Sequence, residues 1–531
     1  MKDGSGSRFI GRRQVLGGIG LLAAAPLVAQ QRTPPRMPGF PFTLGVASGD
    51  PEPNGFVLWT RLAPRPTEPL AGLDQVPYTV RWQVSEDEGF RRIAAEGETL
   101  ARPELGYSVH VTPTTLRPGR AYHYRFMAGT ETSATGRART LPAAGDDVRR
   151  VRLGVAGCQD YQSGLYTAFA HLAAEDADAI FHYGDYMYEY GPRASVFSWE
   201  TGEQIPTVRQ HDRPMVFSLD DYRRRYALIR LDPDLQAAHA SAAFLCSFDD
   251  HEVVNNWVGD IDPANTPVEY LRLRRAAAMQ AWYEFMPVRE DAFPRDGFSG
   301  PWRQYRFGRL LDARKLNTRN HRTDQPCDDK FGAWCEGVND PAAQVLGTAQ
   351  EDWLVSGLTR APARWNALLQ QIMMMDLDRA PQTATGAQTR GINTDSWAAY
   401  TVPRDRLLSR LAPVPNLIVL TGDEHQHHAG EIRPTGAAPE TPPSAIEFVT
   451  TSATSGSDGP GVRKQHAEIL RRNPGLKYIR DERGYSLMTI TPDGWTADMK
   501  TVSTVRAPGG RVATAASWRI PAGAARLEQA G

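Results

Sequence analysis

The sequence predicts two folded parts, an all-β sandwich followed by a larger α/β (α+β) sandwich domain. Between residues 38 and 142, short strand-like segments alternate with turns. After residue 150, near-continuous apolar runs alternate with helical stretches, which is typical of a sheet covered on both faces. The length of 531 residues agrees with this division, because it exceeds what one ordinary core holds.

Residues 1–31 are predicted to be a targeting segment. Arg12 and Arg13 precede an apolar run, VLGGIGLLAAAPLVA, which is too short and too rich in glycine for a membrane span. The stretch GRRQVLGG looks like a twin-arginine export signal, and the alternative is an ordinary secretory signal that contains two arginines. We therefore expect an exported, soluble mature chain with no stable membrane span, cleaved near Ala29.

Residues 38–142 form the predicted N-terminal sandwich, of the immunoglobulin or fibronectin kind. Segments such as GFVLWTRL and AYHYRFMAG are typical of strands, and turns such as DPEPNG and RPGR separate them. This spacing indicates a small β-sandwich. The region contains no cluster of catalytic residue types.

Residues 150–505 form the predicted α/β domain, and residues 506–531 a loosely held tail rich in glycine and alanine. The strand-like segments VRLGVAG, AIFHYGD, AFLCSFDD and NLIVLTGDE are separated by helical stretches such as SGLYTAFAHLAAEDA. Such alternation predicts a sheet with helices on its faces.

Composition and cysteine usage exclude several classes of protein. The formal net charge of −1 provides no bulk field for nucleic acid or an anionic membrane. Four cysteines are too few for a disulfide scaffold. Cys327 and Cys335 lie close together in PCDDKFGAWCEG, so they either pair in an oxidising compartment or stay as free thiols.

Four predicted strands of the α/β domain end in polar clusters. LGVAGCQD ends near Cys158, and IFHYGD ends in Asp185. LIVLTGDEHQHH delivers Asp423 and His425. The remaining strand, FLCSFDDHEVVNNW, delivers Asp249, Asp250, His251, Asn255 and Asn256. Because ligands bind outside the carboxyl ends of strands in open α/β sheets, we expect all four clusters to form one site.

This mixture of side chains is typical of a metal site. Carboxylates, imidazoles and carboxamides are ligands for divalent and trivalent metals. The acidic candidates outnumber those that a zinc hydrolase needs, which favours two or more ions bridged by a shared carboxylate. In two-metal sites the ions polarise a phosphoryl oxygen and supply a hydroxide for in-line attack. The sequence therefore indicates hydrolysis of phosphate esters.

The stretch HYGDYMYEYG adds a candidate phenolate ligand. Tyr188 follows Asp185 by about one helical turn, so both side chains can reach one ion. A tyrosinate is a hard anionic donor that suits ferric iron, as in tyrosine-ligated haem. A bound cation also lowers the pKa of a phenol. We interpret Tyr188 as a ligand rather than a packing residue, and Tyr186 and Tyr190 as packing aromatics.

A set of motifs resembles the alkaline phosphatase D family, a branch of the calcineurin-like metallophosphoesterases that is related in its site to purple acid phosphatases. The motifs are GCQD, GDYMYEYG, FDDHEVVNNW, LLDARK, LGTAQEDWL, DSWAAY and TGDEH. The segment GVASGDPEPNGFVLWTRL resembles the family's N-terminal domain, and the resemblance covers roughly residues 40–505. It implies a metallophosphoesterase sandwich domain that holds one Fe(3+) and Ca(2+) ions.

The resemblance implies roles for single residues on the first three strand ends. Cys158, Asp185 and Tyr188 match the family's iron ligands, and Asp185 bridges to calcium. Asp250 stands where related phosphoesterases place a metal-binding asparagine. The alternative for Cys158 is a buried thiol, but its place at a strand end favours a ligand.

The resemblance also assigns the catalytic residue and the remaining ligands. Asp423 and His425 match the family's GDxH pair of metal ligands. His251 stands at the position of the histidine that stabilises the transition state or protonates the leaving group, with a turn-capping histidine as the alternative. Asn255 and Asn256 are weaker candidates for contacts with phosphate or calcium.

Three features leave the roles of residues open. Arg314 in LLDARK either binds substrate phosphate as a planar fork or pairs with Asp312 as structure. Asp249 either orients His251 or caps a turn. DSWAAY departs from the family's DxWDGY, so local loop contacts are expected to differ.

The predicted function is that of an exported, metal-dependent alkaline phosphatase. A metal-bound oxide or hydroxide attacks phosphorus, and His251 assists the leaving group. The runner-up is phosphodiesterase or phospholipase D-type activity of the same family, and the alternative from another class is a non-catalytic exported metal- or phosphate-binding protein. The expected partners are a phosphate-ester substrate and the twin-arginine export machinery. The expected location is the periplasm or the medium.

Overall fold

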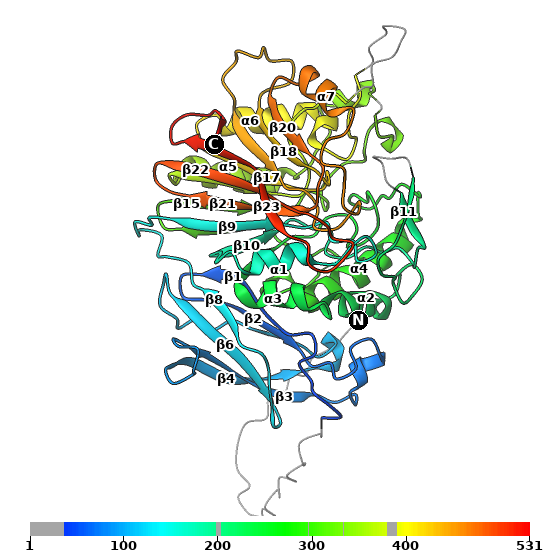
Figure 1. Ribbon diagram of the computed structural model, residues 1–531, viewed down its shortest axis with the longest axis vertical. Helices are drawn as coiled ribbons and strands as arrows, with labels where there is room; N and C mark the ends of the chain where they lie inside the picture. The colour runs from blue at the N-terminus through cyan, green and yellow to red at the C-terminus, as the bar shows by residue number, and fades with distance from the viewer. Residues whose placement is uncertain (1–36, 198–202, 296, 333, 380–389, 531) are drawn as a thin grey trace, which may run out of the picture. The chain divides into compact units, whose positions relative to one another are not determined.

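Two large stacked sheets dominate the computed structural model (Figure 1). The predicted targeting segment, residues 1–31, lies outside the described part of the chain. None of the described helices has the length and apolarity that crossing a bilayer requires. The described residues are 37–530, except 198–202, 296, 333 and 380–389.

The first sheet has ten strands and carries three of the four predicted strand ends. In spatial order its strands are β24 (Glu528–Gln529), β23 (Val512–Pro521), β22 (Gly494–Val502), β21 (Gly484–Ile490), β9 (Val151–Ala156), β10 (Ala179–His182), β13 (Ala243–Cys246), β1 (Val46–Glu52), β2 (Gly55–Arg61) and β5 (Ser108–Val111). The central strands β9, β10 and β13 are parallel, so their carboxyl ends open onto the same edge.

The second sheet has seven strands and carries the fourth strand end. Its order is β14 (Arg303–Phe307), β15 (Leu311–Lys315), β16 (Trp365–Leu369), β17 (Leu417–Thr421), β19 (Ala445–Val449), β18 (His427–Ile432) and β20 (Leu476–Arg480). The strands β15, β16, β17 and β19 are parallel to one another.

Alternating side chains divide the core into layers. Along β10, Phe181 packs between the two sheets, whereas its neighbour Ile180 faces a helical layer. The far face of the second sheet is covered by further helices through residues such as Leu368 and Leu407. The order of layers is therefore helix, sheet, sheet, helix, with α1 to α4 on the first sheet (Figure 1). This α/β sandwich agrees with the predicted fold class.

Some of the helices on the first sheet begin where the sequence supplies a capping residue. For example, Ser218 and Asp221 form a reciprocal capping box at the start of α2, and Asp232 caps α3 ahead of a proline. The helices are α1 (Thr167–Ala173), α2 (Leu219–Arg230), α3 (Pro233–Ser241), α4 (Val268–Phe285), α5 (Thr348–Arg360), α6 (Thr401–Leu411) and α7 (His466–Arg472). Short elements are η1 (Pro69–Gly72), η2 (Pro103–Leu105), η3 (Glu290–Ala292), η4 (Cys327–Asp329), η5 (Glu336–Asn339), η6 (Trp397–Ala399), β11 (Ser195–Phe197) and β12 (Gln204–Pro206).

The N-terminal region is a pair of packed sheets, but it is not self-contained. Its first sheet consists of β1, β2 and β5 and continues into the α/β domain, because β1 pairs with β13 in parallel. The two sheets enclose a core that includes Phe56, Leu58 and Tyr124, and also Ala243 of β13. The other sheet contains β4 (Ile93–Ala101), β3 (Tyr78–Ser85), β6 (Ala121–Ala128), β7 (Glu131–Thr132) and β8 (Gly136–Arg139).

The C-terminal segment differs from the predicted loose tail. Within residues 506–531, β23 pairs with β22 along its length, and Trp518 packs into the core between the sheets. The glycine and alanine content misled the prediction, because alternate apolar side chains in SWRIP are enough to build a strand on an existing edge.

Candidate metal centre and active site

The four predicted strand ends converge on one buried site. Cys158, Asp185 and Asp250 follow β9, β10 and β13 of the first sheet, and Asp423 follows β17 of the second. Three overlapping groups of side chains are close enough to hold a metal ion. Within each group, the ligand atoms lie within 4.8 Å of one another. These groups are Cys158, Asp185 and His425; Asp185, Asp250 and His251; and Asp249, Asp250 and Asp423.

The first half of the site, which we call the thiol–phenol group, consists of Cys158, Asp185, Tyr188 and His425. The Cys158 Sγ lies 3.4 Å from Asp185 Oδ2. The Tyr188 hydroxyl lies 2.9 Å from the same oxygen and 3.5 Å from His425 Nε2. The phenol oxygen, carboxylate, thiol and imidazole therefore point at a common centre, as the sequence predicts.

Burial disfavours the charged forms of the side chains in this group. Burial raises the pKa of the Cys158 thiol, and the charges of Asp185 and Asp423 raise it further. Burial also raises the pKa of the Tyr188 phenol, again with Asp185 adding to the effect. The pKa of His425 falls to about 3, mainly through burial, so its imidazole is neutral and available as a ligand. A metal ion would favour the thiolate and phenolate that burial disfavours.

The other half, which we call the carboxylate group, consists of Asp249, Asp250 and Asp423. The buried Arg319 donates to Asp249 and lies 3.7 Å from Asp250, so this half contains its own cation. Burial raises the pKa of Asp249 to about 6, although Arg319 opposes the shift. Against the effect of burial, His251 and Arg319 lower the pKa of Asp250.

The oxygens of these carboxylates fit the cations that the family resemblance implies. Three buried oxygens of the site, Asp185 Oδ1, Asp249 Oδ2 and Asp250 Oδ1, accept no hydrogen bond from the residues that the structure describes. Buried carboxylate oxygens without partners are costly, and a bound cation removes that cost. Hard oxygen donors suit calcium, and the phenol and thiol beside them suit a ferric ion.

Backbone conformation marks the same residues. Cys158, Asp185, Asp423 and His425 all have left-handed backbones, with φ of 48°, 54°, 66° and 55°. Such conformations cost about 1–3 kcal/mol each for non-glycine residues and persist only where the surroundings fix them. Four such positions on three separate loops indicate that the fold is built to aim these side chains at one centre.

A tyrosine and two glycines fix the loops that carry Cys158 and Asp423. A Cβ atom on Gly157 or Gly422 would lie 2.4 Å or 2.2 Å from the ring of Tyr183. The ring therefore packs between the two loops only because both residues lack a side chain. The Tyr183 hydroxyl donates to the Thr451 carbonyl, which ties the second sheet to the same point.

Glu252 fixes the loops of the first sheet. Its carboxylate accepts hydrogen bonds from the backbone N–H groups of Asp185, Tyr186 and Asp249, at 3.1, 2.7 and 2.8 Å. One buried side chain therefore holds the loop after β10 against the loop after β13. The sequence prediction assigned Glu252 no role, because nothing in a linear sequence shows which backbone groups a glutamate accepts from.

His251 is oriented by a carboxylate that the prediction also missed. Its Nδ1 lies 2.8 Å from Glu189 Oε2, and its ring lies 4.1 Å from the ring of Tyr188. Against the effect of burial, Asp250 and Glu189 raise the pKa of His251. The contact with Glu189 fixes the orientation of the imidazole and leaves Nε2 as its other polar atom. The predicted role of Asp249 in orienting His251 is not supported, because the Asp249 carboxylate accepts a hydrogen bond from Arg319.

A buried ion-pair network supports the carboxylate group. The Arg319 guanidinium forms a two-pronged contact with Asp395, at 2.9 and 2.7 Å, and Arg322 binds the same carboxylate. Asp395 is the first residue of DSWAAY. The sequence placed that motif in the family, but the partner of its carboxylate becomes visible only in the fold.

The weaker candidates divide into two sets. Asn255 accepts from the Tyr190 hydroxyl, and the Asn256 N–H donates to Asp250 Oδ2 at 2.6 Å, so both lie beside the site. Arg314 does not belong to it. Its guanidinium donates to Asp312 and stacks over Trp353, within a strand of the second sheet. Of its two predicted roles, the structural pairing is the one that the geometry supports.

Comparison with known proteins decides the family. The family profile described as PhoD-like phosphatase matches residues 153–499, and the profile of its N-terminal domain matches residues 28–142. The chain belongs to the PhoD-like phosphatase family. Alkaline phosphatase D of Bacillus subtilis (strain 168) is 38% identical over 519 residues, which cover 96% of this chain and 87% of that protein. The predicted membership is confirmed, and the chain is a phosphoric ester hydrolase.

Solved structures agree on the fold. A structure described as that of PhoD matches with a TM-score of 0.89 and 38% identity, over 94% of this chain and 93% of that one. A purple acid phosphatase from yellow lupin (Lupinus luteus) seeds matches with a TM-score of 0.54 and 13% identity, over 91% and 75%. At that identity the lupin protein shows a shared fold only.

Proposed function

We propose that this PhoD-like phosphatase hydrolyses phosphate esters with Fe(3+) in the thiol–phenol group and Ca(2+) in the carboxylate group. The single observation that carries the proposal is the overlap of the three candidate ligand groups: Asp185 belongs to the first and second, and Asp250 to the second and third. Carboxylates shared in this way would hold two neighbouring ions. When bound, the cations supply Lewis acidity at the phosphoryl group and activate the attacking water.

The chain's own residues supply orientation and a proton. Glu189 holds the Nδ1 of His251, which directs Nε2 toward the space beside Asp185 and Asp250. In the protonated imidazolium, Nε2 is the acid that donates to the leaving oxygen of the ester. The ring of Tyr188 packs against the imidazole and limits its rotation. Asn255 and Asn256 are proposed to contact phosphate at the same edge.

The test is the His251→Ala variant of the metal-loaded enzyme. Removal of a general acid is expected to lower kcat by about 10²- to 10⁴-fold, while the content of both metals stays that of the wild type. Parallel assays with p-nitrophenyl phosphate and bis-p-nitrophenyl phosphate separate monoesterase from diesterase activity. Turnover that survives the substitution would show that His251 is not the acid.

Diester hydrolysis, including phospholipase D-type cleavage, is the second candidate within this family. The described residues favour neither ester class through a specific contact, so the two substrates above decide between them. A non-catalytic binding protein is the weaker alternative, because binding alone does not require the oriented pair of His251 and Glu189.

Export through the twin-arginine route is proposed from Arg12 and Arg13, with the periplasm or the medium as the destination. That route carries folded proteins, so metals can be inserted before export. Lysine at both positions is expected to retain the enzyme in the cytoplasm, which cell fractionation measures. We also propose that residues 38–142 form an immunoglobulin- or fibronectin-like sandwich and that the α/β domain begins at residue 150.

A further inference from the structure

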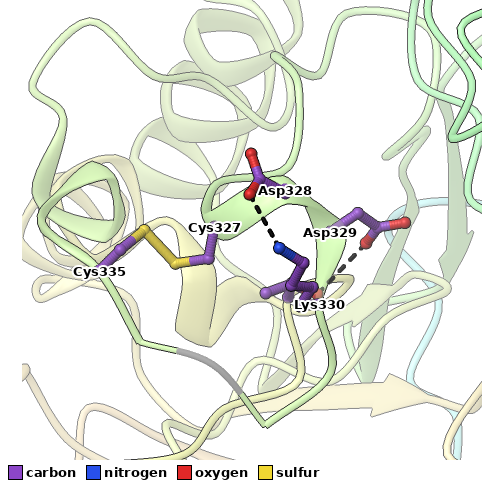
Figure 2. Close-up of a disulfide and its surroundings, with 6 residues drawn as sticks. Cys327, Asp328, Asp329, Lys330 and Cys335 are labelled. Atoms are coloured by element: carbon purple, nitrogen blue, oxygen red, sulfur yellow. Dashed lines mark hydrogen bonds and ion pairs between the residues drawn. A yellow bond between two sulfur atoms is a disulfide. The ribbon is translucent and has the colours of Figure 1, made fainter.

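A disulfide-closed loop lies beside the carboxylate group. Cys327 and Cys335 form a disulfide, which is one of the two alternatives that the sequence left open (Figure 2). Cys327, Asp328 and Asp329 are consecutive residues with left-handed backbones, at φ of 63°, 55° and 52°. Non-glycine residues visit this region singly rather than in runs, so outside contacts must hold the loop in this shape.

Asp329 supplies the contact toward the active site. Its Oδ2 accepts from Asn256 Nδ2 at 2.8 Å, and its Oδ1 accepts from Thr394 Oγ1 at 3.2 Å. The neighbouring Asp328 leaves the loop in a different direction and pairs with the exposed Lys330 (Figure 2). Its side chain is 85% exposed, whereas the Asp329 carboxylate is tied to two active-site loops.

Asn256 is held on nearly every side. Its backbone N–H donates to Asp250 Oδ2 at 2.6 Å, and its carbonyl accepts from Gln325 Nε2 at 2.8 Å. Because an ionised carboxylate cannot donate, Asp329 must face the Nδ2 end of the Asn256 amide. Within the described part of the chain, no protein group donates a hydrogen bond to Asn256 Oδ1, whereas Nδ2, the backbone N–H and the carbonyl all have partners. The other edge of the amide, with Oδ1 and the second N–H of Nδ2, is left for a ligand.

We propose that Asp329 is a positioning residue for the substrate phosphate, acting through Asn256 and fixed in place by the Cys327–Cys335 disulfide. This inference rests on the proposed function, because it requires a phosphate ester beside Asp250. Asp329 fixes which end of the amide points outward, and the second N–H of Asn256 then donates to a phosphoryl oxygen. The disulfide keeps the strained run from relaxing away from Asn256.

The experiment compares Asp329→Ala with the matched control Asp328→Ala on the same loop. For each metal-loaded variant, three quantities are measured: the content of both metals, the Kd for inorganic phosphate, and kcat and KM. We expect Asp329→Ala to raise the phosphate Kd and KM about tenfold, as for the loss of a charge-assisted hydrogen bond. Metal content and kcat should stay within about twofold of the wild type. Asp328→Ala should match the wild type in all three.

Two further variants keep the test decisive if Asp329→Ala folds poorly. Asp329→Asn keeps the size of the side chain but no longer dictates the orientation of the Asn256 amide, so a smaller rise in phosphate Kd is expected. The Cys327→Ser/Cys335→Ser double variant should raise the phosphate Kd in the same direction. Serine variants are preferable to thiol reductants, because a reductant would also reduce a ferric ion.

Several results would overturn the inference. Phosphate affinity equal to the wild type in both Asp329 variants would contradict the positioning role. Loss of metals in those variants would show that Asp329 supports the metal site instead. Unchanged phosphate affinity in the serine double variant would show that the disulfide is not needed to position Asp329. Failure of the wild type itself to bind metals or to hydrolyse phosphate esters would count against the proposed function, whereas an active wild type with unaffected variants would count against this inference alone.

Discussion

The two halves of the site solve the same problem of buried charge in different ways. The carboxylate group contains a permanent counter-charge, because Arg319 reaches Asp249 and Asp250 from within the fold. In the thiol–phenol group, the side chains that share the centre are a thiol, a phenol, a carboxylate and a neutral imidazole. None of these is a permanent cation.

The difference predicts two kinds of metal dependence. The carboxylate group can exist without its ion, because Arg319 already offsets part of its charge. The thiol–phenol group reaches its anionic form only with a strongly charged ion, because burial raises the pKa of both Cys158 and Tyr188. A calcium ion that exchanges and a ferric ion that stays bound are therefore expected.

The largest effect is expected where the two halves meet. Asp185 belongs to the thiol–phenol group and also forms a candidate ligand group with Asp250 and His251, beside the carboxylate group. In Asp185→Asn, turnover should therefore fall roughly a thousandfold or more and both metals should be lost. Asp176→Asn is the matched control, because Asp176 has the same left-handed backbone, at φ 49°, but forms a surface ion pair. Elemental analysis and a turnover assay measure the outcome. Retention of both metals in Asp185→Asn would show that neither ion depends on the Asp185 carboxylate.

A smaller effect is expected when the built-in cation is removed. Arg319→Met leaves buried carboxylates without their partner, which should lower the free energy of unfolding of the calcium-free protein by about 3–5 kcal/mol. Calcium should restore part of that loss, because it replaces the missing charge. Urea unfolding with and without a calcium chelator measures both. A loss of stability that is identical in the two conditions would show that Arg319 and calcium do not share a role.

The smallest effect concerns pH. Burial raises the pKa of Asp249 to about 6, and the proposed calcium site requires the deprotonated carboxylate. Calcium affinity should therefore be nearly constant above pH 7 and fall about tenfold per unit below pH 6. Titration calorimetry of the calcium-free protein between pH 5 and 8 follows this change. Asp249→Asn should flatten the profile, and a wild-type profile without slope would contradict the assignment.

Sequence patterns predicted which strand ends converge better than which side chains hold those ends in place. Cys158, Asp185, Asp423 and His425 were found because each follows an apolar strand within a few residues, which is a local signal. Arg319, Asp395, Glu189 and Glu252 act across loops that are distant in sequence, so their partners appear only once the two sheets are stacked. The sequence left Arg314 open between substrate binding and structural pairing, and only the fold shows that its guanidinium donates to Asp312.

The fold, like the site, was predictable where the signal is local and not where it depends on residues distant in sequence. Alternating apolar runs were sufficient for the sheets of the α/β domain, because strand periodicity is local. The continuation of the N-terminal sheet through β1 into β13, and the pairing of β23 with β22, depend on which edges remain open after folding. Edge pairing is a property of the assembled sheet, and composition alone misassigned residues 506–531 to a tail.

The proposed metal site is tested most directly by metal analysis together with the visible absorption spectrum, on purified wild type and Tyr188→Phe. We expect iron and calcium in the wild type, with a broad visible band from phenolate-to-iron charge transfer. In Tyr188→Phe that band should disappear while calcium content is unchanged. Zinc alone in the wild type, or a band that survives the removal of the Tyr188 hydroxyl, would contradict the division of the site into two unlike halves.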